Sequence, residues 1–204
     1  MRRKIKGLIL DFGGVISQPQ APDRVATMSR LLNLPVDTFK DTYFSLRGRL
    51  DLGRITSYEY WREIMAVHSI TPKVEIIDKL IREDVLSWTR INDEMISFIR
   101  DKRAGTEKIS IISNMTLDCL DYIEKNFRWL NIFDSPVFSC NLGLIKPDKP
   151  IYEYCLRNLN LQPDECLFTD DSGSNVLGAK NVGMHAIHFS SFLEFLDQVN
   201  EHYT

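Results

Sequence analysis

The chain of 204 residues has no large excess of charge of one sign and no long hydrophobic run. Its net charge of −3 provides no broad positive field for nucleic acid or anionic lipid. The apolar stretch behind the basic residues 2–4 is short and ends at Asp11, so it predicts neither a secretory signal nor a membrane span. We expect a cytoplasmic protein that contacts neither nucleic acid nor membrane; its oligomeric state is left open.

The cysteines and glycines also lack the spacings that are typical of zinc, disulfide and dinucleotide sites. No CxxC pair and no zinc-like spacing to histidine is found among Cys119, Cys140, Cys155 and Cys166, which predicts reduced, packed thiols. The spaced glycine pattern of dinucleotide-binding proteins is missing after the first predicted strand, where Asp11 would repel a pyrophosphate. Disulfide, zinc, nicotinamide and flavin sites are therefore not expected.

The chain divides into a helical segment and a segment of alternating pattern. Residues 21–88 have helical spacing throughout, as in the buried face predicted from Ile77, Leu80, Ile81 and Val85. Elsewhere short apolar runs predict strands at 5–10, 109–112, 137–138, 166–169 and 184–189, separated by helices near 93–100, 117–126, 150–158 and 175–180 and followed by a closing helix. This alternation predicts a parallel sheet covered on both faces, with the helical segment inserted after the first strand.

Polar side chains follow three of the predicted strands at their carboxyl ends. Asp11 follows the first strand, Ser113-Asn114 follows residues 109–112, and Asp170-Asp171 follows residues 166–169. Ligands of parallel sheets bind at this edge. Because Asp11 and Asp171 would repel each other without a cation, and because hard oxygen ligands suit Mg²⁺, we expect a magnesium site there. A metal-bound Asp11 could then attack a phosphoryl group.

Two further residues have the chemistry of a phosphate site. Ser113 precedes a predicted helix, where its hydroxyl and free main-chain N–H groups could hold phosphate oxygens, and the same segment could also cap the helix. Lys146 lies in a proline-containing stretch, 143–150, that predicts a rigid loop with no regular helix until after Pro150. Its ammonium could neutralise a transferring phosphoryl group, or could be a solvated surface charge.

These segments together resemble the haloacid dehalogenase superfamily, in the branch with a small helical cap inserted after the first strand. The resemblance is carried, in order along the chain, by residues 8–16, 111–114, 146–152 and 167–184. It implies an α/β fold: a three-layer Rossmann-like core with a parallel sheet formed by residues 1–16 and 92–204, and an α-helical cap formed by residues 17–91.

The resemblance also implies a role for each matching residue. Asp11 would accept the phosphoryl group, and Ser113, Asn114 and Lys146 would hold its oxygens. Mg²⁺ would be bound by the carboxylates and by one main-chain carbonyl, that is by Asp11, Asp171, Asp170 and Gly13. Asp170 would act either at the metal or behind it.

The sequence departs from the family at Gly13, where the resemblance implies an aspartate that acts as general acid and base. Such a group typically contributes about 10²–10⁴-fold in rate. We therefore expect a slow or leaving-group-limited phosphatase of a small phosphorylated metabolite, such as an anomeric sugar phosphate, an acyl phosphate or an aryl phosphate. A group from the cap could substitute, and the candidates are Arg47, Arg49, Asp51 and Glu59.

Two alternatives stay open at this point. The protein could bind a phosphorylated ligand or a partner protein with little turnover, and Gly13 would then mark the lost step. Carbon–halogen hydrolysis by Asp11 needs no metal, but without a metal nothing would compensate the repulsion between Asp11 and the pair Asp170-Asp171. We therefore prefer the phosphatase.

Overall fold

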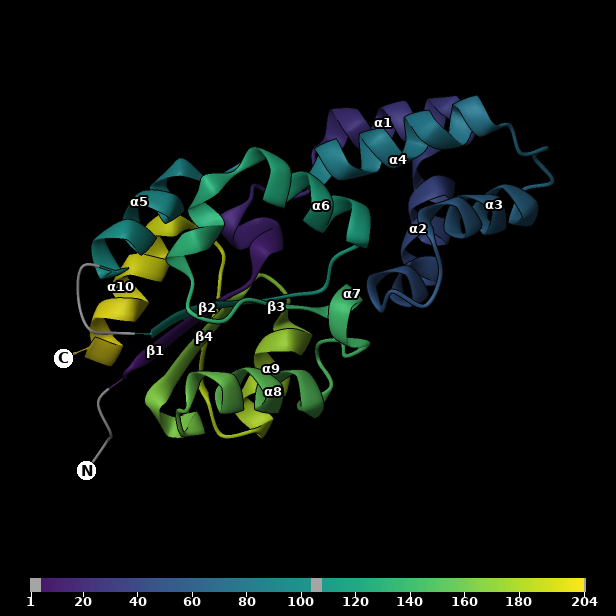
Figure 1. Cartoon of the computed structure of the whole chain (residues 1–204). Coiled ribbons are helices and arrows are strands. Elements are labelled where there is room, and N and C mark those ends of the chain that lie inside the picture. The colour runs from purple at the N-terminus through teal and green to yellow at the C-terminus, as the bar shows by residue number, and fades with distance from the viewer. Residues whose placement is uncertain (1–4, 104–107, 204) are drawn as a thin grey trace.

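The computed structural model describes residues 5–103 and 108–203, with side chains described up to residue 200. Its centre is a five-stranded sheet with the order β3-β2-β1-β4-β5 (Figure 1). The strands are β1 (Gly7–Leu10), β2 (Lys108–Ser113), β3 (Val137–Phe138), β4 (Cys166–Asp170) and β5 (His185–His188). Every pairing between neighbouring strands is parallel, so the predicted α/β class is confirmed.

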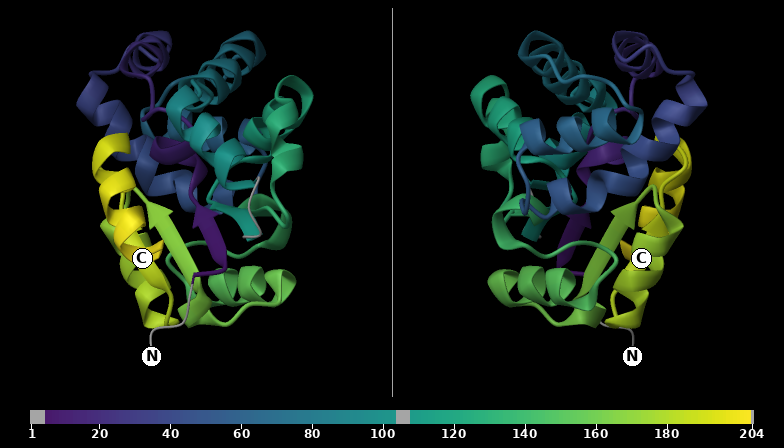
Figure 2. Two further views of the ribbon diagram at one scale, coloured as in Figure 1. Left: turned by 90° about the vertical axis from the view of Figure 1, so that its left-hand side faces the viewer. Right: turned by 90° about the vertical axis from the view of Figure 1, so that its right-hand side faces the viewer.

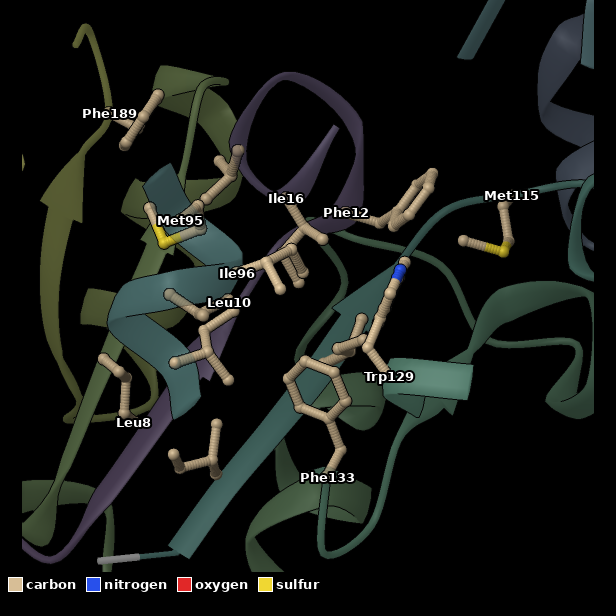
Figure 3. Close-up of a cluster of buried hydrophobic side chains, with 14 of the residues drawn as sticks. Leu8, Leu10, Phe12, Ile16, Met95, Ile96, Met115, Trp129, Phe133 and Phe189 are labelled. Atoms are coloured by element: carbon tan, nitrogen blue, oxygen red, sulfur yellow. The ribbon is translucent and has the colours of Figure 1, made fainter. Parts of the chain in front are cut away.

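The two faces of the sheet are covered by different helices, as the alternation of β1 requires. Leu8 and Leu10 pack with α5 (Asp93–Arg103), α6 (Leu117–Asn126) and α10 (Phe192–Tyr203), and Figure 3 shows this cluster around Met95. Ile9 points to the opposite face and packs with α8 (Lys149–Leu159) and α9 (Gly173–Asn181). A central strand buried on both faces explains why this run is apolar throughout.

The inserted segment folds into helices that have a hydrophobic core of their own. These are α1 (Pro22–Leu31), α2 (Val36–Asp51), α3 (Ser57–Val67) and α4 (Val74–Trp88). They lie beyond α6, to one side of the sheet layers (Figures 1 and 2). Phe39 and Trp61 stack in their centre with ring centroids 6.2 Å apart, and both are wholly buried. The separate core supports our proposal that residues 17–91 form a cap.

The two segments that connect the insert to the sheet run side by side. Ser17 and Ile91 form an antiparallel bridge. On either side of it, Gln18 N–H donates to Arg90 at 2.6 Å and Asn92 N–H donates to Ile16 at 2.9 Å. The chain thus leaves the sheet and returns to it through one paired connection.

The insert also touches the core directly near α7 (Ser139–Leu142). The Ser139 hydroxyl donates to the main-chain carbonyl of Asp51 at 2.5 Å, and the Ser57 hydroxyl donates to Asp118. Gly53 has a φ of 66°, and a Cβ there would lie 2.4 Å from the carbonyl oxygen of Cys140. This close approach needs a glycine.

Local structure differs from the sequence prediction at a few positions. Helix α8 begins at Lys149, so the prediction that no regular helix forms until after Pro150 is wrong, because proline is tolerated in the first helical turn. Helix α7 and the 3₁₀ turns at Arg128–Ile132 and Pro163–Glu165 were not predicted. All four cysteines are free and buried, as predicted. In the described ranges, no helix has both the length and the apolar character that crossing a membrane requires.

Candidate active site

A cavity of about 390 Å³ lies between the inserted helices and the carboxyl ends of the central strands. Six of the predicted site residues line it: Asp11, Gly13, Ser113, Asn114, Lys146 and Asp171. Asp170, the seventh, is wholly buried beside them. Strands β1, β2 and β4 are neighbours in the sheet, so their ends deliver residues from distant parts of the chain to one place.

Three carboxylates converge on this cavity. Asp11, Asp170 and Asp171 each offer an oxygen, and these oxygens lie within 4.8 Å of one another. Lys146 places its Nζ 2.7 Å from Oδ1 of Asp11 and 2.6 Å from Oδ2 of Asp170. One buried ammonium therefore faces three acids, which leaves an excess of negative charge that a cation would neutralise.

Asp170 is held by hydrogen bonds to both of its carboxylate oxygens. Its Oδ1 accepts hydrogen bonds from Ser172 N–H at 2.8 Å and from Asn175 Nδ2 at 3.0 Å, while its Oδ2 accepts from Lys146. Both oxygens are thus occupied by donors that fix the start of α9 and the lysine. This supports a role behind the metal rather than on it.

Burial is the main influence on the ionisation of the two other acids. It raises the pKa of Asp11 to about 7, with Lys146 acting in the opposite direction. The pKa of Asp171 is raised by burial and by the nearby Asp170. Burial alone would lower the pKa of Lys146, but the two carboxylates beside it outweigh burial and raise it. A divalent cation would favour the ionised acids, and an all-oxygen donor set is the kind that Mg²⁺ accepts.

Asn114 and Ser113 differ in what they are free to bind. The Asn114 side chain accepts from Lys146 N–H at 2.9 Å and donates to the Lys146 carbonyl at 3.0 Å, so it clamps the lysine loop. The Ser113 hydroxyl has no hydrogen-bond partner anywhere in the described parts of the chain and lines the cavity. Ser113 is therefore the side chain most available to a phosphate oxygen.

A family model for haloacid dehalogenase-like hydrolases matches residues 5–183. The chain belongs to this hydrolase family. The matched range includes the inserted helices and every residue of the acidic cluster, so the family assignment and the geometry concern the same residues.

Several known proteins are similar in sequence to this chain. Acyl-CoA dehydrogenase family member 10 of Mus musculus is 30% identical over 91% of the chain, which spans only 18% of that relative's length. Sesquiterpene phosphatase astK of Aspergillus oryzae is 26% identical over 75% of the chain and 82% of its own length. D-ribitol-5-phosphate phosphatase of Bacteroides thetaiotaomicron is 24% identical over 88% of the chain and 89% of its own length.

A solved haloacid dehalogenase family enzyme from Bacteroides thetaiotaomicron has the same fold. It superposes with a TM-score of 0.73 at 17% identity, covering 94% of this chain and 98% of the enzyme. That enzyme was crystallised with magnesium and inorganic phosphate. At this identity the comparison establishes the shared fold of the dehalogenase-like hydrolases.

The two glycines after Asp11 have different structural requirements. Gly14 has a φ of 76°, and a Cβ there would lie 2.2 Å from Oδ2 of Asp171, so only glycine fits. Gly13 has an ordinary φ of −68°, and a Cβ there would meet the Trp88 ring at 3.4 Å. The backbone therefore accepts a side chain at position 13, beside an aromatic ring that sequence analysis did not assign to the site.

Of the four cap residues considered as substitutes for the missing acid, two line the cavity. These are Arg47 and Asp51, both on α2. Arg49 instead pairs with Glu63 at 2.9 Å on the exposed side, and Glu59 caps the start of α3. The spacing of Phe44, Arg47 and Asp51 by three and four residues places them on one helix face, a signal that could have separated them from Arg49.

Arg47 is the centre of a buried polar network in the inserted helices. Its Nε lies 2.9 Å from Asp51 Oδ1, and its Nη1 lies 2.7 Å from Asp84 Oδ2. Tyr43 donates to Asp84 Oδ1 at 2.5 Å, and the Arg47 guanidinium stacks 4.9 Å from the Tyr43 ring centroid. Burial raises the pKa of Asp51, although Arg47 opposes this. Sequence analysis missed Tyr43 and Asp84.

Proposed function

We propose that this protein is a Mg²⁺-dependent phosphatase that acts on a small phosphorylated molecule through Asp11. The observation that carries the proposal is the placement of Lys146 between Asp11 and Asp170, with Asp171 within reach of the same cation. Two relatives named as phosphatases and a fold neighbour crystallised with magnesium and phosphate support it.

The residues at the carboxyl end of the sheet fit a magnesium ion. Asp11, Asp171 and the main-chain carbonyl of Gly13 would hold it, and Asp170 would orient Asp171 and Lys146 from behind. When bound, the ion neutralises charge on phosphoryl oxygens and favours the ionised form of Asp11. That form is the nucleophile, and burial alone opposes it.

The reaction divides into two displacements at phosphorus. In the first, a carboxylate oxygen of Asp11 forms a bond to phosphorus while the bond to the leaving oxygen breaks, giving an aspartyl phosphate and the free alcohol or phenol. In the second, water attacks the same phosphorus, and inorganic phosphate leaves as the Asp11 carboxylate is restored. Lys146 and Ser113 bind the equatorial oxygens, where negative charge is concentrated in both transition states.

The absence of a side chain at Gly13 should limit the rate of turnover. No side chain at that position protonates the leaving oxygen or takes a proton from water, so the proton must come from solvent or from the cap. Turnover should therefore depend strongly on the leaving group, and substrates that leave without protonation should react fastest.

The test is hydrolysis of p-nitrophenyl phosphate with Mg²⁺, with EDTA, and with the Asp11→Asn variant. We expect release of p-nitrophenol with Mg²⁺ and only background release in the other two cases. Undiminished turnover by Asp11→Asn protein would remove Asp11 as the nucleophile.

A second candidate function is favoured by Gly13 alone: a protein that binds a phosphorylated ligand or a partner with little turnover. The substitution Gly13→Asp separates the two, because the backbone there accepts a Cβ. A large gain of phosphatase activity supports the binding protein with a lost step. No gain, or a loss, supports a phosphatase that works without that acid.

We further propose that residues 17–91 close over the cavity as a cap, bending near 16–22 and 88–92. The paired connection between Ser17 and Ile91 and the cap residues that line the cavity support this. Opening and closing would admit substrate and exclude water during transfer. The cytoplasmic location stays a prediction.

A further inference from the structure

The cavity has a polar floor, and apolar and polar side chains share its walls. The floor is the acidic cluster with Ser113 and Lys146, where a phosphoryl group would bind. Apolar side chains from both the core and the inserted helices form much of the remaining lining: Phe12, Phe44, Trp88, Met115, Cys119 and Pro147. These side chains offer an apolar surface to the organic part of a substrate held over Asp11.

The side chain of Trp88 lies beside Gly13 in the cavity lining. The place next to Gly13 is occupied by its ring, 3.4 Å from the position of a Cβ. The indole Nε1–H donates to the Tyr43 hydroxyl at 3.2 Å, which ties this side chain to the cap network. A leaving group next to Gly13 is thus offered a positioned aromatic face in place of a carboxylate.

Phe44 adds a second aromatic surface to the cavity wall. Its side chain is 52% exposed, although it lines the cavity. It packs edge-on against Tyr43, with ring centroids 4.9 Å apart. An apolar ligand in the cavity would remove this exposed ring from water, which favours binding.

The charged groups of the cap are mainly engaged with one another. Arg47 and Asp51 are the charged cap residues in the cavity lining, and they form an ion pair that also includes Asp84. The polar core residues in the lining are also engaged: Asn114 bonds to Lys146, Ser172 to Ser174, and Asn175 to Asp170. Sugar or polyol hydroxyls that lie against the Trp88 and Phe44 rings would have no partner there, and buried hydroxyls without partners weaken binding. An apolar group has no hydrogen bonds to lose when it is buried against these rings.

We propose that the cavity selects phosphates whose organic group is apolar and flat, with an aryl phosphate as the simplest case, over sugar and polyol phosphates. This inference rests on the proposed function and narrows its substrate class. It agrees with Gly13, because a phenolate leaves with little need for a proton, whereas an alkoxide leaves poorly without one.

The test uses phosphonates, whose carbon–phosphorus bond Asp11 does not cleave, so that binding is measured apart from turnover. Calorimetric titration of the Mg²⁺-loaded protein compares methyl-, butyl-, phenyl- and 3,4-dihydroxybutylphosphonate. We expect phenylphosphonate to bind about 10- to 100-fold more tightly than methylphosphonate. Butylphosphonate should bind about tenfold more tightly than its dihydroxy counterpart. Equal or tighter binding of the dihydroxy compound would overturn the proposal.

Two variants test whether the preference for phenylphosphonate arises from contact with Phe44. Phe44→Ala should weaken phenylphosphonate binding about tenfold and leave methylphosphonate binding unchanged. Val67→Ala removes an apolar side chain that is 61% exposed at the end of α3 and should change neither. Equal weakening of both phosphonates by Phe44→Ala would overturn the placement of the organic group against this ring.

Failure of this inference differs from failure of the proposed function. Hydrolysis of sugar phosphates together with preference for the dihydroxy phosphonate overturns the substrate class and leaves the phosphatase intact. The expected phosphonate preference without hydrolysis of any phosphate overturns the phosphatase and keeps the binding preference. If no phosphonate binds although p-nitrophenyl phosphate is hydrolysed in a Mg²⁺-dependent way, the substrate class falls and the phosphatase stands.

Discussion

Lys146 holds its ammonium 2.7 Å from Oδ1 of Asp11, and both residues are almost wholly buried. The contact joins a strand end to a loop that lies 135 positions further along the chain. In the proposed reaction the same ammonium turns from the carboxylate to the phosphoryl oxygens, so it serves both to hold the nucleophile and to stabilise transferred charge.

Removal of this ammonium should impair turnover strongly. We expect Lys146→Met to lower kcat for p-nitrophenyl phosphate by about 10²–10³-fold, the usual effect of removing one preorganised charge-stabilising group. Lys149→Met is the matched control, because Lys149 pairs with Glu153 on the surface. Steady-state kinetics on both variants checks the prediction, and equal losses would show that the effect is not local to the cavity.

The raised pKa of Asp11 predicts a pH-dependent stability of the metal-free protein. The pKa is about 7 in the fold and 3.8 for an ordinary aspartate. Between these values the folded state keeps a proton that the unfolded state has lost. Asp11 therefore lowers the free energy of unfolding as pH rises, by at most about 1.4 kcal/mol per pH unit, and its effect levels off above pH 7.

Urea denaturation in EDTA between pH 5 and pH 8 measures this effect. The slope that Asp11 contributes is the difference between the wild type and Asp11→Asn, whose side chain does not titrate. Saturating Mg²⁺ should flatten the difference, because the ion replaces the proton. An Asp11 contribution that rises with pH would contradict the direction of the shift.

The two glycines of the first loop should differ strongly in how much stability an alanine substitution costs. Gly14→Ala places a Cβ against Asp171 at a positive φ and should cost at least about 2 kcal/mol of stability and weaken Mg²⁺ binding. Gly13→Ala meets only the Trp88 ring at contact distance and should change stability by less than about 1 kcal/mol. Chemical denaturation and Mg²⁺ titration compare the pair, and similar losses in both variants would contradict it.

The Arg47–Asp84 ion pair should matter far more than an exposed pair in the same helices. Asp84→Ala leaves the buried Arg47 without its main partner and should cost about 3–5 kcal/mol. Glu63→Ala breaks the exposed pair with Arg49 and should cost less than about 1 kcal/mol. Urea denaturation of the whole chain gives both values, and a small loss for Asp84→Ala would mean that Arg47 is satisfied by other groups.

Much of the core could be predicted from the sequence because its signals are local. The buried strands are mostly apolar runs. Asp11 directly follows β1, and Ser113 and Asp170 are the last residues of β2 and β4, so their meeting at one sheet edge follows from parallel topology. The regular helices could likewise be placed to within a few residues. Strand β1 starts at Gly7, two residues later than expected.

The cap side of the cavity could not be predicted, because its contacts are not local. Arg47 and Asp84 are 37 residues apart and lie on different helices, so no local pattern links them. The packing of Trp88 over Gly13 depends on how the whole insert sits against the sheet. Helix α7 has only four residues, which is too short for a periodic pattern, and its first residue, Ser139, bonds to Asp51 of the distant insert.

The paired connection at Ser17 and Ile91 has a consequence for how such proteins diversify. Because both ends of residues 17–91 meet at a single hydrogen-bonded point, the insert can be exchanged for one of another length without rethreading any strand. The insert's share of the cavity wall, with Phe44 and Trp88, and the acidic cluster at the sheet edge thereby lie in separate stretches of the chain. Grafting this insert onto the core domain of a relative would transfer its part of the cavity wall to that domain.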